Sequence, residues 1–436
     1  MNRRTFISYA AATTGLTFDG LRDAPAGASI PAAFLLSDVG CSRATGYEET
    51  NKIVTLNGKT HVAWLDSPRE GFRVRIRTLD HASGIWEPTV TVGEAHDNHG
   101  GPALTVDSQG YLHIVYFPHH HPMRYRKSVR PNDASEWGEE ETFGSTTTYP
   151  TLVCAPDDTL IVTCRESSKS APWLCNRYIK RPGKVWEGPH PIMQALTGGY
   201  AHFMEALAWG HEGKTLHLSC RLYDGSPGHG HTIGYMRSAD YGETWTRLDG
   251  NALALPVTAH TIDVVSKEPT VANGDLRGGS IITDSHGLPL VLCSHYGTRT
   301  AWLSYPDGHG GWANTAFTPP LPEPEGWGLV TPGGIAFSGN GELHAVLTLV
   351  GKPAGPEDSL WGHPSSEIAH FVSQDNGRSF VGSVITEVDA AVPRWLPNLE
   401  RPTGHNRTES APHFMFTEGV RGGTNTELVQ NRVYFV

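Results

Sequence analysis

The sequence carries no excess of positive charge. Its 34 lysines and arginines are outnumbered by 45 aspartates and glutamates, which gives a formal net charge of −11. Nucleic-acid-binding proteins normally present basic surfaces, so this balance argues against such a partner but leaves room for a local basic pocket for an acidic ligand. Beyond the N-terminal residues, no apolar run is long enough to cross a membrane.

Cysteine is also scarce and shows no spacing typical of a disulfide framework. We interpret most of the six cysteines as small, buried apolar residues: Cys41, Cys154, Cys164, Cys175, Cys220 and Cys293. Glycine (49 residues) and proline (31 residues) are frequent by contrast. This composition is typical of a turn-rich, all-β chain.

The N-terminus has the features of an export signal. Twin arginines, Arg3 and Arg4, precede a mildly apolar run that is too short and too polar for a membrane span. This resembles a twin-arginine signal. We expect residues 1–30 to be the signal and a short linker, with cleavage within Ala24–Ala33 and a periplasmic or secreted product. The alternative is an ordinary disordered terminus.

A β-rich unit of roughly fifty residues recurs along the rest of the chain, as in radial repeat folds. Each unit has an apolar strand, a Gly/Asp/Asn turn, a second strand, a third often rich in Arg or Tyr, and a last strand near Trp or Phe. Residues 32–39 can close a ring against the C-terminal NRVYFV, leaving few bare edges. We predict one all-β domain over 31–436, a six- or seven-bladed β-propeller, and favour seven.

Two segments support this prediction. Ser238–Trp245 and Ser373–Phe380 both fit the pattern S-x-D-x-G-x-[TS]-[WF] and resemble the Asp-box of sialidase-type propeller blades. In such a box the aspartate caps a tight turn and the aromatic residue packs between blades. The pattern is a fold marker and carries no catalytic residue.

Two consecutive hairpins present the residues with useful chemistry. The first has predicted strands Pro102–Val106 and Tyr111–Phe117, followed by a third at Met123–Ser128. A turn centred near Gln109 places His99 opposite His119 at the open end. The second hairpin turns at residues 156–158. It places Tyr149 opposite Arg165, beside the histidines if the hairpins are neighbours.

This set of side chains favours one kind of reaction. No carboxylate pair for glycoside hydrolysis and no nucleophile for a serine-type triad is apparent. Two imidazoles, a phenol and a guanidinium fit the removal of a proton next to a carboxylate. A cation neutralises the carboxylate, a base takes the C5 proton of a uronate, and an acid protonates the leaving oxygen. This is β-elimination by a polysaccharide lyase.

The segment HGGPALTVDSQGYLHIVYFPHHHPMRYRKS, followed by YPTLV and DDTLIVTCR, resembles the BNR-repeat-type propellers that include the ulvan lyases of polysaccharide lyase families 24 and 25. The resemblance implies that Tyr149 and His119 do the acid/base work, with the division between them open. It also implies that His99 and Arg165 hold and neutralise the uronate carboxylate. Gly100 departs from the family, which usually has Asn there.

Further residues are candidates for binding the substrate. Arg221 ends HLSCR and is a second anion contact or, alternatively, part of an inter-blade salt bridge. Tyr223 can stack against a sugar. His120 is included because the run of three histidines leaves the register open by one residue.

A metal site is a weaker prediction. Cys293 and His295 lie on the same side of one strand and can form half of a zinc site, with His202 and Asp275 as further candidates. The resemblance supports this, since a structural zinc occurs in that family. The alternative is a buried cysteine beside a satisfied histidine. We expect no cofactor to be required for catalysis.

The sequence therefore predicts an exported, monomeric lyase acting on an acidic, sulfated rhamnose–uronate polysaccharide, most simply ulvan. One rival is a hydrolase on the same scaffold, such as a rhamnosidase. A sialidase is disfavoured because Ser29-Ile30-Pro31 lacks the arginine of the Arg-Ile-Pro signal. The other rival is a non-catalytic carbohydrate-binding propeller.

Overall fold

Short apolar stretches separated by Gly, Asn and Asp turns form strands throughout the protein. The computed structural model describes residues 33–223, 232–267, 276–351, 362–388, 392–409 and 411–436, and every regular element in them is a β-strand. No helix in this part of the chain is long and apolar enough to cross a membrane. The prediction of an all-β chain is confirmed there. The predicted export signal lies outside these residues.

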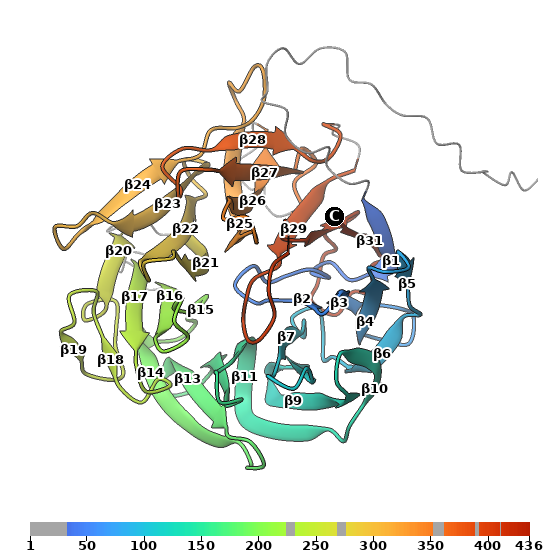
Figure 1. The fold of residues 1–436 in the computed structure, drawn as a ribbon, viewed down its shortest axis with the longest axis horizontal. Helices are drawn as coiled ribbons and strands as arrows, with labels where there is room; N and C mark the ends of the chain where they lie inside the picture. The colour runs from blue at the N-terminus through green and yellow to red at the C-terminus, as the bar shows by residue number, and fades with distance from the viewer. Residues whose placement is uncertain (1–32, 224–231, 268–275, 352–361, 389–391, 410) are drawn as a thin grey trace, which may run out of the picture. The chain divides into compact units, whose positions relative to one another are not determined.

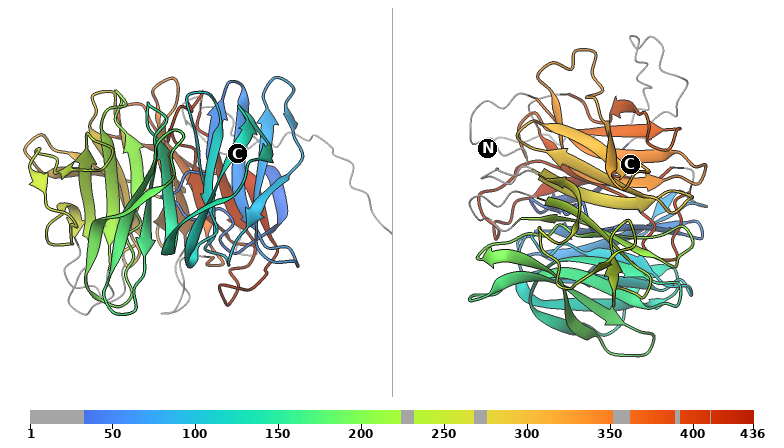
Figure 2. Two further views of the ribbon diagram at one scale, coloured as in Figure 1. Left: turned by 90° about the horizontal axis from the view of Figure 1, so that it is seen from below. Right: turned by 90° about the vertical axis from the view of Figure 1, so that its left-hand side faces the viewer.

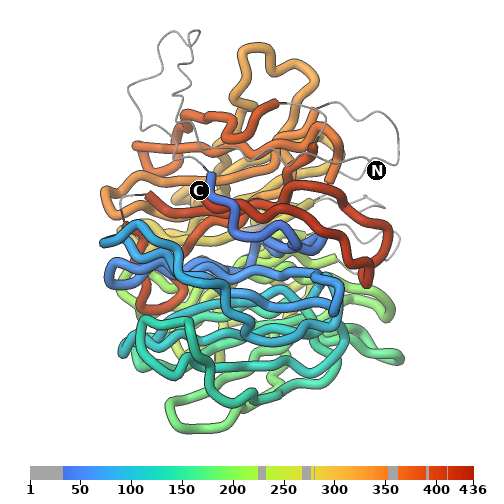
Figure 3. Tube along the Cα trace, turned by 90° about the vertical axis from the view of Figure 1, so that its right-hand side faces the viewer, coloured from blue at the N-terminus to red at the C-terminus, as the bar shows by residue number. Residues whose placement is uncertain are grey.

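The largest sheet brings the two ends of the described chain together. Its nine strands are β1 (Phe34–Gly40), β2 (Ile53–Leu56), β3 (Lys59–Asp66), β4 (Arg73–Asp80), β5 (Ile85–Trp86), β6 (Val90–Glu94), β29 (Arg394–Leu399), β30 (Phe414–Glu418) and β31 (Asn431–Phe435). Strand β1 pairs antiparallel with β31, so that blue and red segments run side by side in Figure 3. The predicted contact between residues 32–39 and the C-terminal strand is thus confirmed.

The second sheet carries both hairpins singled out in the sequence. Its eight strands are β7 (Ala103–Val106), β8 (Leu112–Tyr116), β9 (His119–Arg130), β10 (Asp133–Trp137), β11 (Glu141–Cys154), β12 (Leu160–Glu166), β13 (Pro172–Lys180) and β14 (Glu187–Gly198). Strand β9 begins at His119, earlier than the predicted Met123, because its first residues pair with β11. The first half of β11 pairs with β9 and the second half with β12, which joins the two hairpins.

Three smaller antiparallel sheets complete the described fold. The first contains β15 (Ala206–Trp209), β16 (Leu216–Leu222), β17 (Thr232–Ser238), β18 (Trp245–Thr246), β19 (Ala252–Leu253) and β20 (Asp263–Lys267). The others contain β21 (Leu276–Thr283), β22 (Pro289–His295), β23 (Thr300–Pro306) and β24 (Trp312–Ala316), and β25 (Gly328–Phe337), β26 (Leu343–Val350), β27 (Glu367–Ser373) and β28 (Val381–Val384). Within residues 33–436 the sheets follow one another in chain order around a common centre (Figures 1 and 2).

Both predicted Asp-boxes form the same turn. In the first, Asp240 accepts hydrogen bonds from Thr244 N (2.8 Å) and Thr244 Oγ1 (2.6 Å). In the second, Asp375 accepts the equivalent bonds from Ser379 at 2.8 and 2.6 Å. The aromatic residue of the first box, Trp245, is among the largest fully buried side chains. In both boxes the aspartate therefore caps the turn, as predicted, and in the first the aromatic residue is buried.

Candidate active site

One carboxylate holds two of the predicted histidines. Asp97, between β6 and β7, lies 3.0 Å from His99 Nδ1 through Oδ1 and 2.5 Å from His119 Nδ1 through Oδ2. The two rings stack, with centroids 3.8 Å apart and planes 20° from parallel. Because a carboxylate only accepts hydrogen bonds, each ring carries a proton on Nδ1. The first hairpin thus delivers both imidazoles to one spot, as expected.

Burial and hydrogen bonding set the charges in this group. Burial lowers the pKa of His99 to about 3, so its ring is neutral near pH 7 and its Nε2 is an acceptor. Burial acts to raise the pKa of Asp97, but hydrogen bonds from the two histidines outweigh it and hold that pKa well below its usual range. The His119 side chain is 17% exposed, whereas His99 is 5% exposed. His119 is therefore the imidazole more open to a substrate.

Tyr149 lies at a bulge in β11 and does not pair with Arg165. The register shifts between Thr148 and Thr151, so that Arg165 faces Thr148, and the predicted pairing was wrong by one residue. Tyr149 has a φ of 59°, in the left-handed region that non-glycine residues rarely adopt. Its ring still lies 5.9 Å from that of His99. Backbone strain of this kind is concentrated at functional sites.

Arg165 is enclosed by aromatic rings. It is 1% exposed, and its Cζ lies 4.5 Å from the centre of the Tyr149 ring, 4.8 Å from Trp173 and 5.3 Å from Tyr200. A guanidinium is favourable against such ring faces. Burial raises the pKa of Tyr149, and the charge of Arg165 opposes that rise. The guanidinium therefore stabilises the phenolate form of a tyrosine that is neutral at rest.

Three further residues belong to the group but were not predicted. Arg43 Nη1 donates a short hydrogen bond to Tyr47 OH, and the Tyr47 ring meets Tyr149 edge-on with centroids 4.6 Å apart. Arg43 and Tyr47 lie between β1 and β2, outside both hairpins, so no local pattern pointed to them. Asp97 was within reach of sequence reasoning, because it stands two residues before His99 in the same short segment.

Positive charge gathers around the site in spite of the acidic composition. The ring of His202 lies 4.6 Å from that of Tyr149. Burial lowers the pKa of His202 well below its ordinary value, and four nearby arginines act in the same direction: Arg221, Arg165, Arg277 and Arg43. The acidic net charge of the chain did not exclude a local basic region, and these four arginines form one. It suits an anionic ligand.

The predicted binding residues Arg221 and Tyr223 lie beside this basic region. The Arg221 Cζ is 5.1 Å from the centre of the Tyr223 ring, and Tyr223 lies 6.3 Å from Tyr200. Tyr200 is 51% exposed, so one ring of the set faces solvent. Aromatic surfaces next to buried cations can hold a sugar ring and its acidic group together.

His120 occupies a separate position. Its Nδ1 lies 2.6 Å from Ser167 Oγ, and its ring meets Trp173 edge-on with centroids 5.5 Å apart. Burial lowers the pKa of His120 to about 4, and the charge of Arg165 adds to this. His119 is therefore the member of the triple histidine that reaches Asp97, and His120 lines the neighbouring aromatic wall.

The ligands predicted for zinc do not gather among the described residues. Cys293 Sγ lies 3.6 Å from the Val291 carbonyl, and His295 Nδ1 accepts a hydrogen bond from Thr298 N at 3.0 Å. The ligand atoms of Cys293, His295 and His202 do not form one group in the described part of the chain. Asp275, the fourth candidate, lies outside the described residues.

Two groups of potential ligand atoms are present elsewhere in the described residues. Asp97, His99 and His119 form one, although their Nδ1–carboxylate distances fit hydrogen bonds. Cys154, Asp158 and His405 form the other, at the far end of β11.

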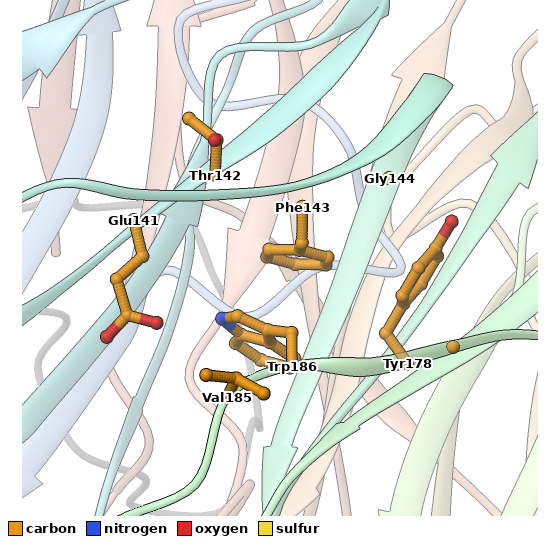
Figure 4. A pocket seen from close by; sticks show the side chains of 8 residues that line it. Glu141, Thr142, Phe143, Gly144, Tyr178, Val185 and Trp186 are labelled. Carbon is orange, nitrogen blue, oxygen red and sulfur yellow. The ribbon is translucent and has the colours of Figure 1, made fainter.

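A pocket of about 480 Å³ contains none of the predicted site residues. It lies at the start of β11, where Trp186 stacks on Phe143 with centroids 4.1 Å apart (Figure 4). Its one carboxylate, Glu141, is paired with Lys180 at 2.8 Å. Its lining brings no acid/base pair together, unlike the Asp97 group, which consists of Asp97, His99, His119 and Tyr149.

The sequence pattern of the BNR repeat-containing family matches residues 59–318, which include the Asp97 group and both hairpins. This chain belongs to that family. Two curated relatives of this BNR-repeat protein are ulvan lyases. Those of Pseudoalteromonas sp. (strain PLSV) and Alteromonas sp. (strain LOR) are each 22% identical, over 276 and 281 residues. The matches cover 54% of this chain and 55% and 56% of the relatives, so the chain spans about half the length of the curated relatives it matches.

Solved structures match over nearly the whole BNR-repeat protein. A PL25 ulvan lyase superposes with a TM-score of 0.66 at 16% identity, covering 92% of this chain and 94% of that one. A PL25 ulvan lyase bound to -[GlcA(1-4)Rha3S]- superposes with a TM-score of 0.65 at 15% identity, covering 92% of this chain and 94% of that one. The polysaccharide lyase Uly1 superposes with a TM-score of 0.59 at 13% identity, covering 92% of this chain and 96% of that one. At these identities the likeness shows a shared fold.

Proposed function

We propose that this BNR-repeat protein is a polysaccharide lyase that cleaves a 4-linked uronate next to rhamnose by β-elimination, with ulvan as its substrate. The observation that carries the proposal is the group made by Asp97, His99, His119 and Tyr149. It offers proton-transfer groups without a carboxylate pair, next to a basic region. The ulvan lyase activity of two relatives at 22% identity supports the same reaction class.

We propose further that the strands form a seven-bladed propeller. The nine-stranded sheet consists of two groups that meet at the single register pair Gly40–Asp66. The eight-stranded sheet consists of two groups that share β11. With the other three sheets this makes seven groups among the described residues. An experimental structure that resolves the strands would count the blades directly.

The proposed mechanism assigns a task to each residue. Asp97 holds both Nδ1–H groups, which leaves Nε2 as the ring nitrogen of His99 and of His119 that can meet a ligand. Tyr149 and His119 share the acid/base work. The base takes the C5 proton, the electron pair forms the C4–C5 double bond, and the C4–O bond breaks as the acid protonates the leaving oxygen. Which of the two residues is the base stays open.

Neutralisation of the uronate carboxylate is the task proposed for the arginines. His99, to which the family resemblance gave a share in this task, is a neutral ring with an accepting Nε2 and is proposed instead to orient the substrate by accepting a hydrogen bond from a sugar hydroxyl. Four arginines act electrostatically on His202, whose ring lies 4.6 Å from that of Tyr149: Arg221, Arg165, Arg277 and Arg43. Because C5 lies next to the carboxylate, neutralising that group lowers the barrier to removal of the proton. The same cations suit a sulfated polymer, since the guanidinium matches sulfate as well as carboxylate.

One assay separates this proposal from its rivals. Purified protein is incubated with ulvan, and the ultraviolet absorbance of the new conjugated double bond is followed together with reducing ends. Tyr149→Phe and His119→Ala are expected to abolish the absorbance. Tyr434→Phe, on β31 between β30 and β1, and His286→Ala, in an exposed turn, are the matched controls and are expected to keep it.

The other outcomes of that assay favour the rivals. New reducing ends without absorbance would mean hydrolysis by a rhamnosidase or a related glycosidase. Neither signal, with retained binding to the polymer, would favour a non-catalytic carbohydrate-binding protein. Loss of absorbance in the control variants as well would point to unfolding and leave Tyr149 and His119 without the proposed roles.

We also propose that the protein acts outside the cytoplasm, as a monomer and without a metal in the catalytic step. The twin arginines, Arg3 and Arg4, support export. Fractionation of cells that express the full chain and its Arg3→Lys/Arg4→Lys variant tests this. The variant is expected to remain in the cytoplasm, and equal distribution of the two would refute export by this route. Light scattering of the purified protein gives its oligomeric state.

A further inference from the structure

Three side chains of different chemistry converge where the inner hairpins turn, at the end of β11 opposite to the active site. The Sγ of Cys154, a carboxylate oxygen of Asp158 and a ring nitrogen of His405 all lie within 4.8 Å of one another. Cys154 is the last residue of β11, five residues after Tyr149, so the two are about 17 Å apart along the strand. The cluster is therefore distinct from the Asp97 group.

One distance between the ligand atoms, and two from them to a neighbouring carbonyl, are close to the edges of a tetrahedron around zinc. Zinc binds nitrogen and oxygen at about 2.0–2.2 Å and thiolate sulfur at about 2.3 Å, so tetrahedral edges are about 3.3–3.5 Å. His405 Nε2 lies 3.4 Å from Asp158 Oδ1 and 3.4 Å from the Ala155 carbonyl oxygen. Cys154 Sγ lies 3.6 Å from that same oxygen. With the Cys154 Sγ within 4.8 Å of both other ligand atoms, small side-chain movements would bring the set to the distances of a four-coordinate ion.

We propose that Cys154, Asp158 and His405 bind a divalent transition metal ion, for which zinc has the best-matched chemistry. Thiolate, imidazole and carboxylate together are a donor set that zinc favours over calcium or magnesium. The Ala155 carbonyl or a water completes the coordination. Binding displaces the thiol proton of Cys154 to solvent and leaves the sulfur as a thiolate, with no change in oxidation state.

Two hydrogen bonds from Ser108 orient the Asp158 carboxylate for metal binding. Asp158 Oδ1 accepts a hydrogen bond from Ser108 N and Oδ2 one from Ser108 Oγ, both at 2.7 Å. These bonds fix the orientation of the carboxylate and leave a lone pair on each oxygen for a metal. His405 is 30% exposed, which gives an ion a route to the buried Cys154.

The position of the cluster indicates what the ion does. The long connection between β29 and β30 crosses the centre of the molecule towards β7 and β11 (Figure 1). Its Thr403 carbonyl accepts a hydrogen bond from Cys154 N at 2.7 Å, and His405 N donates to the Val106 carbonyl at 3.1 Å. An ion shared by Cys154 and His405 would fasten this connection to the two hairpins that carry the active site. Its role is structural and does not depend on the proposed lyase activity.

Cobalt(II) is the probe that tests this site. The purified full-length protein is stripped with a chelator, dialysed and titrated with Co²⁺, and the thiolate-to-cobalt charge-transfer absorption is recorded. We expect about one equivalent to bind with that absorption, because a cysteine is a ligand. Cys154→Ser is expected to abolish the absorption, and His405→Gln and Asp158→Asn to weaken binding at least tenfold.

Matched controls identify the cysteine and the site. Cys164→Ser, on the adjacent strand, and His99→Gln, in the Asp97 group, are expected to keep the cobalt–thiolate absorption. Circular dichroism of each variant establishes that it is folded. Thermal unfolding adds a second readout: zinc is expected to raise the melting temperature of the wild type but not that of folded His405→Gln.

Two results would overturn the proposal. The first is the absence of the charge-transfer absorption in folded wild type at saturating Co²⁺. The second is an absorption that survives in Cys154→Ser and disappears in Cys293→Ser, which would place the metal at the other predicted cysteine. Retention of zinc-dependent stabilisation in His405→Gln would likewise remove His405 from the site.

Discussion

His99 and His119 stack face to face, with ring centroids 3.8 Å apart. Two imidazolium rings at that distance would repel each other by about 4 kcal/mol at an effective dielectric constant of about 20. Asp97 lies between their Nδ1 atoms and compensates one positive charge. Because burial keeps His99 neutral near pH 7, this repulsion does not arise in the folded protein.

The first prediction concerns this shared carboxylate. Asp97→Asn keeps the shape of the side chain, but an amide can accept from only one imidazole and presents an N–H group to the other. One ring must then turn or change its tautomer, and its Nε2 is lost as a base or acceptor. We expect kcat on ulvan to fall by about 10²–10⁴-fold with a small change in KM, measured by initial rates of absorbance.

The matched control is a second Asp–His pair at the other end of the same hairpin. Asp107 Oδ2 lies 3.1 Å from His113 Nε2 in a buried turn that has no part in the proposed chemistry. Asp107→Asn is expected to lower the melting temperature while the folded protein keeps its kcat. Equal losses of kcat in Asp97→Asn and Asp107→Asn would contradict a specific role for Asp97.

The second prediction concerns recognition of the acidic polymer. Arg221→Gln removes one cation from the basic region. We expect KM for ulvan to rise by about 10–100-fold with kcat less affected, in line with 1.5–3 kcal/mol for a hydrogen bond to a charged group. Arg181→Gln is the control, because Arg181 is 45% exposed and paired with Glu187 on an outer strand. An unchanged KM in folded Arg221→Gln would exclude Arg221 from substrate binding.

Local pattern was enough to predict much of this site. The alternation of residues and the turn at Asp107 brought His99 to His119, because hairpin pairing follows from nearby sequence. The bulge at Tyr149 was not predictable, since a bulge depends on how β11 passes from one neighbour to the next. Arg43 and Tyr47 were missed for a related reason: they reach the site from a connection whose path is set by tertiary contacts alone.

The third prediction concerns pH. Glu205 directly precedes β15, and its side chain is buried. Burial raises its pKa to about 8. The folded state therefore binds more protons than the unfolded state between about pH 4.5 and 8, so stability falls as the pH rises through that window.

The Gln side chain in Glu205→Gln is neutral at every pH, so the variant should lack this pH-dependent contribution to stability. We expect the free energy of unfolding to decline less in the variant between about pH 5 and 8, by on the order of a few kcal/mol. Chemical denaturation at several pH values measures the difference. Parallel pH profiles for wild type and variant would mean that Glu205 titrates normally in the folded protein.

The fourth prediction concerns the two Asp-boxes. Asp240→Ala removes the acceptor for Thr244 N and Oγ1, and Asp375→Ala does the same for Ser379. Each is expected to reduce the free energy of unfolding by about 1–2 kcal/mol, because the donors of a tight turn lose their partner. The boxes share no contact partner, so the losses in the double variant should add to within about 0.5 kcal/mol.

Denaturant unfolding of the three variants, beside lyase assays of the folded proteins, checks this prediction. Glu212→Ala is the control, because its side chain is 79% exposed and lies 4.0 Å from Lys214. It should change stability by no more than about 0.5 kcal/mol. Unchanged kcat in folded Asp240→Ala and Asp375→Ala would agree with a purely structural role. A loss of kcat without a loss of stability would instead connect these turns, on the sheets of β17 and β27, to the catalytic centre.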